Sequence, residues 1–275
     1  MIQALQKVIR NRLALGVLIA YTSVLVACGI TIFPDSEDVK LGQQLDGQIR
    51  ANPGEYPILK GHPEIKTYVI GVVNTVLASP EVKKRGVYAY AVEIIGDDKT
   101  INAFCTPGGY IYVYTGLLKF IDNEATLAGV LGHEIAHAER RHASKRMTSY
   151  YGTQILLGMA LGSNPSQVEQ IAANLFTNIG FMKNSRDDET EADNYSMIYL
   201  RSTIYYPGAI TNFFNKINAS GKGNASALEK LFLTHPPSSE RAANVKARMA
   251  EWYVPEPDES NTFTKRYKDV MKKLP

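Results

Sequence analysis

The segment His133-Glu134-Ile135-Ala136-His137 places two imidazoles and a carboxylate at a spacing that can bind and use a metal ion. On an α-helix, His133 and His137 lie about 40° apart around the axis and point the same way. Glu134 is offset by about 100°, so its carboxylate lies beside such an ion rather than on it. That position suits a general base that takes a proton from a metal-bound water. Imidazole and carboxylate ligands without thiolates favour Zn²⁺, and we expect one zinc ion per chain.

A catalytic zinc ion needs a third protein ligand and an open position for water, and a later acidic segment offers the candidates. If residues 185–202 are helical, Glu189 and Asp193 share a face with the apolar Met197, which is expected to point inward. Glu191 lies about 200° away around that helix and is expected to face water. We therefore expect Glu189 to be the ligand, with Glu191 as the alternative. Asp193 is expected to accept the other ring N–H of a ligand imidazole.

The pattern of apolar residues predicts the elements that position these side chains. A small early sheet is followed by a body that is almost all helical, which is an α+β arrangement. Strands are expected over residues 88–95, 101–106 and 110–114. Helices are expected over residues 36–51, 63–78, 123–142, 145–161, 165–178, 185–202, 208–219, 226–233, 239–252 and 262–274.

The N-terminus resembles a bacterial lipoprotein signal. Its basic start is followed by an uncharged, mostly apolar stretch over residues 13–27, which is too short to span a bilayer, since that takes about 20 residues. The stretch ends in Cys28, which is expected to be lipidated and to become the new N-terminus. We expect a signal peptide over residues 1–27 and a lipid anchor and tether over residues 28–35. An ordinary signal peptide or an uncleaved anchor is the alternative.

Composition and charge exclude several classes of protein. The chain of 275 residues is 45% hydrophobic and 21% charged, which is typical of a globular protein and not of a disordered or fibrous one. Its formal charge of +3 comes from Lys7, Arg10 and Arg12, because residues 1–27 contain no acid. The remaining chain is neutral, so nothing in its charge favours a nucleic-acid partner.

An ordered set of motifs resembles the bacterial lipoprotein branch of the CAAX prenyl protease/HtpX-like family of zinc metallopeptidases, which is of the gluzincin type. The resemblance covers about residues 36–252 and implies a zincin-like fold with a metallopeptidase domain over residues 36–254. It implies that His133, His137 and Glu189 bind zinc, that Glu134 is the base and that Asp193 supports the site. The motifs are Asn102-Ala103-Phe104, Pro107-Gly108-Gly109-Tyr110-Ile111, Gly116-Leu117-Leu118, Asn123-Glu124, His133 to His137, Ser185-Arg186, Glu189-x-x-Ala192-Asp193, His235-Pro236-Pro237 and Arg241.

The same resemblance implies that His235 lies near the metal. An imidazole there would either stabilise the oxyanion that forms on the scissile carbonyl or occupy the open zinc position as a reversible block. Arg241 is expected to share this place near the metal. His62, in a Gly-His-Pro turn, and His142, which would point away from His133 on one continuous helix, are not expected to be ligands.

A peptide substrate is expected to pair with a strand next to the site. The strand over residues 110–114 follows a Gly-Gly turn and would suit an exposed edge, where an extended peptide adds by backbone hydrogen bonds. Gly109, Tyr110, Ile111 and Tyr112 are therefore the expected substrate-binding residues. Cys105, on the preceding strand, is expected to be a small apolar residue and not a nucleophile.

The C-terminal residues 255–275 are expected to form a linker and an amphipathic helix. Phe263, Tyr267 and Val270 form part of its apolar stripe, with lysines and arginines around it. We expect this stripe to pack back onto the domain, with binding to a membrane surface or a partner as the alternative.

Together these features predict a membrane-anchored zinc endopeptidase of the bacterial cell envelope. It is expected to face the periplasm, on the outer membrane rather than the inner one, and to cleave misfolded or unassembled envelope proteins. A chaperone-like lipoprotein that binds clients and has a latched, weakly active zinc site is the main alternative. A structural lipoprotein with an incidental metal is the third.

Overall fold

The computed structural model describes residues 31, 33–149, 183–220, 225–237 and 239–275. The predicted signal peptide, Cys28 and the helix predicted over residues 165–178 lie outside the described residues. So does most of the helix predicted over residues 145–161.

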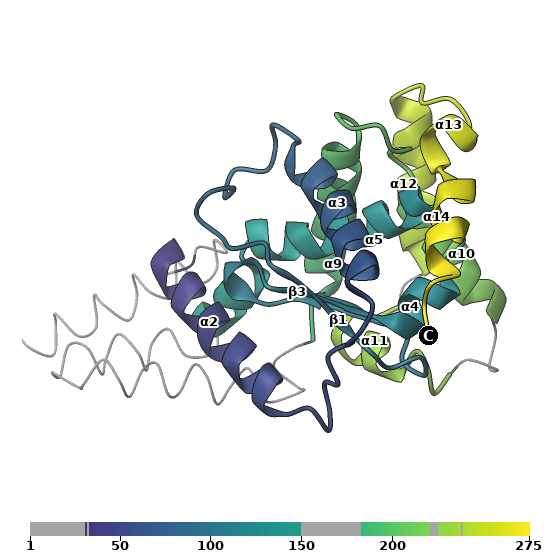
Figure 1. Cartoon of the computed structure of the whole chain (residues 1–275). Helices are drawn as coiled ribbons and strands as arrows, with labels where there is room; N and C mark the ends of the chain where they lie inside the picture. Colours follow the sequence, from purple (N-terminus) through teal and green to yellow (C-terminus); the bar gives the residue numbers. More distant parts are fainter. Residues whose placement is uncertain (1–30, 32, 150–182, 221–224, 238) are drawn as a thin grey trace, which may run out of the picture.

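The fold is α+β, as predicted, with a helical body and a small sheet (Figure 1). The sheet and the 3₁₀ turn η1 (Pro107–Gly109) come early in the chain. The strands are β1 (Val92–Ile95), β2 (Ala103–Cys105) and β3 (Ile111–Tyr114). The helices are α2 (Asp35–Ala51), α3 (Pro63–Leu77), α4 (Thr115–Phe120), α5 (Glu124–Glu139), α9 (Arg186–Leu200), α10 (Ile210–Ser220), α11 (Glu229–Thr234), α12 (Ser239–Glu251), α13 (Glu259–Thr262) and α14 (Thr264–Met271).

The sheet has the order β1-β3-β2, so β3 is its central strand. β3 pairs in parallel with β1 and antiparallel with β2, and all four of its residues are buried. The expectation that residues 110–114 form an exposed edge is therefore wrong, because β1 hydrogen-bonds to the edge that a substrate would need. Strand β2 lies at one edge of the sheet and packs against α5.

The predicted strand over residues 88–95 begins only at Val92. Tyr90 has a positive φ of 42°, which is incompatible with a strand. The hydroxyls of Tyr88 and Tyr90 donate to the buried carboxylates of Asp38 and Glu139 instead. These polar contacts hold the segment before β1 as a loop.

Helix α5 is the centre of the body and is buried along its whole length. The side chain of Asn123, the residue directly before α5, accepts a hydrogen bond from the Thr126 N–H at 2.8 Å and caps the N-terminus of the helix. Gly129 lets α10 approach closely, because a Cβ there would lie 2.8 Å from the backbone nitrogen of Ile210. The Ser196 hydroxyl of α9 donates to the Gly129 carbonyl at 2.7 Å. This close packing sets where α9 lies against α5.

Helix α5 ends at Glu139, before the predicted end at residue 142. Arg141 has a φ of 58° and reverses the chain. Its guanidinium donates to Asp38 of α2 at 2.6 Å, and the Glu139 carboxylate accepts the backbone N–H of Lys83 at 2.9 Å. These contacts hold the turn, and a second helical segment follows over residues 142–149.

The C-terminal helix α14 packs onto the domain, as its apolar stripe predicts. Tyr267 is buried and its hydroxyl donates to the Leu118 carbonyl at 2.6 Å. Arg266 Nε donates to the buried carboxylate of Glu124 at 2.6 Å. Phe263 has a φ of 52° and separates α14 from α13, so the helix predicted over residues 262–274 begins at Thr264, and α13 lies mostly in the predicted linker.

None of the helices in the described part of the chain is both long and apolar enough to cross a membrane.

Candidate metal centre

Four side chains from separate parts of the chain meet in one buried cluster. His133 and His137 come from α5, Glu189 from α9, and His235 follows α11 directly. Each offers one ligand atom, and these atoms all lie within 4.8 Å of one another. Such a cluster can hold a metal ion.

The two histidines of α5 point to the same place, as the helical spacing predicts. Their Nε2 atoms lie 2.9 Å apart. Helix α9 brings the carboxylate: its N-terminus is fixed by a capping box between Ser185 and Asp188, and Glu189 follows on the inward face. The Glu189 oxygens lie 3.5 Å from His133 Nε2 and 3.4 Å from His137 Nε2.

The donor set fits zinc. Imidazole nitrogens and one carboxylate are ligands that zinc takes in metallopeptidase sites, and no thiolate competes in the cluster. Glu189 Oε2 is fully buried yet accepts no well-formed hydrogen bond. Burial alone would raise the pKa of Glu189, but the imidazoles of His235, His133 and His137 outweigh it and hold the pKa well below its ordinary value. The carboxylate is therefore ionised and ready to bind a cation.

Asp193 lies where the sequence places it, one turn after Glu189. Its Oδ1 is 2.8 Å from His133 Nδ1, the ring nitrogen that faces away from the cluster. Arg241 holds both carboxylates: its Nε donates to Asp193 at 2.7 Å, and its Nη1 lies 2.7 Å from Glu189 Oε2. Arg241 therefore neutralises the acidic side of the site.

Glu134 lies beside the cluster and is not part of it. Burial raises the pKa of this carboxyl, while the charges of His235 and His133 oppose the rise. Its Oε1 lies 3.6 Å from His235 Nε2, and the backbone N–H of Cys105 in β2 also bonds to it. A buried carboxylate with a raised pKa can take up and release a proton next to the cluster.

The model of peptidase family M48 matches residues 63–249 of this sequence. The chain belongs to peptidase family M48. The prediction of a metallopeptidase is thereby confirmed at the level of the family.

Several characterised proteins align with this M48 chain. It is 34% identical over 150 residues to the mitochondrial metalloendopeptidase OMA1 of Arabidopsis thaliana, covering 54% of this chain and 30% of that protein. It is 33% identical over 156 residues to the metalloprotease LoiP of Escherichia coli, covering 55% of this chain and 60% of that protein. The beta-barrel assembly-enhancing protease of Yersinia pestis is 25% identical over 244 residues, covering 86% of this chain and 48% of that protein. The chain thus spans less than two thirds of each of these relatives.

Two residues of this M48 site occupy positions that the sequence did not predict. His142 Nδ1 lies 2.7 Å from His137 Nδ1, and His142 Nε2 lies 2.8 Å from Glu191 Oε2. His142 does not point away, because α5 ends at Glu139 and the turn brings the imidazole back. Glu191 does not face only water, since it also accepts from Arg140 Nε at 2.8 Å.

Asn184 is the other residue that sequence reasoning missed. Its Nδ2 donates to Glu189 Oε1 at 2.8 Å and also faces His137 and His235. It directly precedes the cap residue Ser185, so its position next to Glu189 follows from the start of α9. Asn184 therefore helps to orient the carboxylate.

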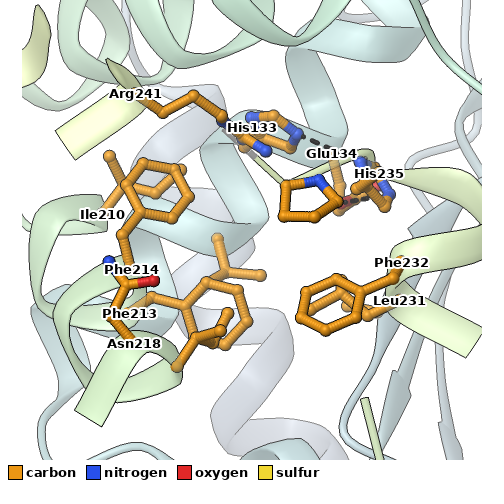
Figure 2. Close-up of a pocket in the computed structure, with 14 residues that line it drawn as sticks. His133, Glu134, Ile210, Phe213, Phe214, Asn218, Leu231, Phe232, His235 and Arg241 are labelled. Atoms are coloured by element: carbon orange, nitrogen blue, oxygen red, sulfur yellow. Dashed lines mark hydrogen bonds and ion pairs between the residues drawn. The ribbon is translucent and has the colours of Figure 1, made fainter. Parts of the chain in front are cut away.

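The predicted substrate strand is not at the pocket of this site. An apolar pocket opens beside the cluster, with His133 and Glu134 at one end and Phe213 and Phe232 at the other (Figure 2). Ala103 of β2 lines it, whereas residues 109–112 do not. The Asn102 carbonyl accepts a hydrogen bond from the backbone N–H of Tyr114. Because successive residues of an antiparallel strand alternate in direction, the N–H and carbonyl of Ala103 point away from β3, toward the outer edge of the sheet.

The side chains of the remaining candidates are not members of the cluster. His62 lies in a surface turn next to Glu64. Cys105 is part-buried in β2, and burial raises the pKa of its thiol well above the ordinary value. It is therefore not activated as a nucleophile.

Proposed function

We propose that this M48 chain is a zinc-dependent endopeptidase in which His133, His137 and Glu189 hold the metal. The observation that supports this most is the convergence of the three ligand groups, with the separate carboxylate of Glu134 beside the cluster. When bound, zinc supplies Lewis-acid chemistry, which makes a water molecule acidic and polarises the scissile carbonyl.

The residues around the cluster perform the proton chemistry and the positioning. Glu134 accepts the proton of the attacking water and passes it to the leaving amine, which its raised pKa favours. Asp193 Oδ1 lies 2.8 Å from His133 Nδ1, which favours a proton on Nδ1 and leaves Nε2 free to bind the metal. Arg241 offsets the negative charge that Asp193 and Glu189 bring into this buried site.

We also propose that the enzyme is anchored in the bacterial envelope and cleaves misfolded or unassembled proteins there. The lipoprotein-like signal that ends in Cys28 supports the anchor and a periplasmic location, with the outer membrane favoured. The beta-barrel assembly-enhancing proteases among its relatives support an envelope role. These features favour the lipoprotein branch of the CAAX prenyl protease/HtpX-like group, with the peptidase domain over residues 36–254.

Degradation of an unfolded protein tests the proposed function. The zinc-loaded protein should cleave reduced, unfolded casein, and Glu134→Gln should lower the rate by on the order of 10²-fold or more, since it removes the proton acceptor. Zinc content is measured for both proteins so that a loss of metal is not mistaken for a loss of the base. Equal rates for the two loaded proteins, or no cleavage by either, would contradict the proposal.

The position of His235 favours a latched form of this enzyme as the second candidate. Its Nδ1 lies 2.9 Å from Glu189 Oε1 and within the cluster, so it is placed to be a fourth ligand. Zinc sites with four protein ligands are closed, whereas catalytic ones keep a position open for water. The chain would then bind clients and cleave them only when His235 withdraws.

Replacement of His235 separates the latch from the oxyanion role. His235→Ala should raise the rate of casein cleavage several-fold if the imidazole blocks the metal. If the imidazole instead stabilises the oxyanion, the rate should fall by about 10²-fold to 10³-fold. An unchanged rate would remove His235 from both roles.

A further inference from the structure

The turn that follows α5 sets the direction of His142. Arg141 has a φ of 58°, a conformation that costs free energy in a residue with a bulky side chain, so surrounding contacts must hold it. His142 comes next, at the start of the helical segment over residues 142–149, and its Nδ1 lies 2.7 Å from Nδ1 of His137. The place of this imidazole therefore depends on what holds the turn.

The buried carboxylate of Asp38 binds the chain on both sides of His142. It accepts two hydrogen bonds from the Arg141 guanidinium, from Nε at 2.6 Å and from Nη2 at 3.1 Å. It also accepts one from the hydroxyl of Ser144 and one from that of Tyr88. Hydrogen bonds between an ionised carboxylate and a guanidinium are among the strong ones. Asp38 thereby fixes the residue before His142 and the residue two places after it.

Helix α2 is a firm support for Asp38, because it packs closely against η1. A Cβ at Gly42 of α2 would lie 2.1 Å from the carbonyl oxygen of Pro107. A Cβ at Gly108 would lie 2.8 Å from the carbonyl oxygen of Asp38 itself. The backbone that carries this carboxylate is therefore held at contact distance by the segment between β2 and β3.

A second cavity connects this contact to the metal centre. Asp38, Arg141 and His142 line it together with His137 and Glu134. Asp38 is not a member of the metal cluster. Its effect on a bound metal must therefore pass through the turn and the imidazole that the turn positions.

We propose that Asp38 is a positioning residue of the metal centre, which holds the imidazole of His142 against the ligand His137. The proposal rests on the proposed function, in which His137 binds the metal. A partner at the second ring nitrogen of a ligand histidine fixes the ring and raises metal affinity. Here that partner is itself held from α2, the helix that follows the proposed anchor segment. The metal affinity of the site therefore depends on α2.

Zinc affinity measures the effect of removing the Asp38 charge. Asp38→Asn keeps the size of the side chain but weakens its contact with Arg141, so the zinc dissociation constant should rise by about 10-fold. Asp46→Asn is the matched control, because Asp46 lies on the same helix but has Tyr112 and Arg50 as its partners. The control should bind zinc like the parent protein. An unchanged dissociation constant in Asp38→Asn would overturn the proposal.

Arg141→Gly separates the contact with Asp38 from the turn itself. Glycine adopts a positive φ without strain, so this variant keeps the turn and loses the guanidinium. Its zinc dissociation constant should also rise by about 10-fold, and circular dichroism checks that it is folded. A value equal to that of the parent protein would show that the backbone turn alone positions His142, which would overturn the proposal.

A double variant shows whether Asp38 acts through His142. His142→Phe removes the imidazole, so adding Asp38→Asn should leave the zinc dissociation constant within about twofold of that of His142→Phe alone. Effects that multiply in the double variant would show that the two residues act independently. The assignment of Asp38 to this imidazole would then be wrong.

The imidazole signals of the metal-free protein keep the two proposals distinguishable. The chain has five histidines, so their ring ¹⁵N signals can be assigned by single substitutions. Asp38→Asn should shift the signals of His142 and His137, whereas Asp46→Asn should leave them in place. If these shifts occur but the parent protein cleaves no casein, the endopeptidase function fails and the positioning by Asp38 stands. Signals that stay unchanged in Asp38→Asn would overturn the positioning.

Discussion

The ring nitrogen of His137 that faces away from the metal cluster has an unusual partner. A carboxylate or a carbonyl commonly accepts this N–H from a ligand histidine, and His133 has such a partner in Asp193. His137 instead faces the imidazole of His142, which Glu191 holds from the other side. If Nε2 of His137 binds zinc, its Nδ1 carries the proton. His142 must then accept that proton's hydrogen bond at Nδ1 and donate from Nε2 to Glu191.

This chain of contacts predicts the effect of removing the His142 nitrogens. His142→Phe keeps the ring size but leaves the Nδ1–H of His137 without an acceptor, so the zinc dissociation constant should rise by about 10-fold to 100-fold. The affinity is measured by competition with a chromophoric chelator.

His62→Phe is the control, because His62 lies in a surface turn beside Glu64, far from His142 in the sequence. The control should bind zinc like the parent protein. An unchanged affinity in His142→Phe would show that the contact does not support the site.

At the scale of elements, the site depends on how closely α9 and α10 pack against α5. Gly129 has no side chain and the Ile210 backbone lies in the space that a Cβ would need. The Ser196 hydroxyl of α9 bonds to the Gly129 carbonyl at the same place. The glycine therefore helps to fix the helix that supplies Glu189 relative to the helix that supplies the histidines.

A pair of glycine substitutions tests this packing. Gly129→Ala should lower the free energy of unfolding by about 1–3 kcal/mol, although alanine is the better helix former, because the added methyl meets backbone atoms that cannot move aside. Gly47→Ala in α2 should instead raise it by about 0.5–1 kcal/mol, since nothing lies within 4 Å of the added methyl. Denaturant unfolding measures both. Stabilisation by Gly129→Ala would show that the helices are not held at contact distance.

The sequence predicts these long helices better than their ends and the sheet. Residues 185–202 and 239–252 show a clear helical period and form α9 and α12 within two residues of the predicted ends. The end of α5 depends on Arg141 reaching Asp38 about a hundred residues earlier, which no local pattern contains. Helix α4 has only six residues, too few to show a period. The edge position of β3 was wrongly predicted because strand order depends on pairing between distant segments.

The candidate site was predictable where a helical period sets direction. His133 and His137 lie one turn apart on α5, and Glu189 and Asp193 lie one turn apart on the inward face of α9. The members of each pair therefore point toward the same site.

Arg241 belongs to the same site, but its contacts with Asp193 and Glu189 arise from tertiary packing and could not be read from spacing along the chain. Asn184 lies next to Glu189 because it directly precedes α9, whereas its approach to His137 and His235 also depends on tertiary packing.

At the scale of the molecule, α5, α9 and the end of α11 bring the four side chains of the buried cluster together. The C-terminal helix α14 packs onto this body through the buried Tyr267 and through the contact of Arg266 with Glu124. The proposed lipid anchor would attach this body to a membrane. Cys28→Ser should release the full chain from the membrane fraction into the soluble fraction. Retention of the variant in the membrane fraction would contradict the anchor.

The most direct test of the account is the zinc stoichiometry of the purified protein and of two matched variants. Glu189→Ala and Glu191→Ala each remove one carboxylate from the same helix, but only Glu189 lies in the cluster. At saturating zinc followed by removal of free metal, the parent protein and Glu191→Ala should retain one zinc ion per chain, and Glu189→Ala should lose it. Full retention by Glu189→Ala, or loss only in Glu191→Ala, would contradict the proposed metal centre.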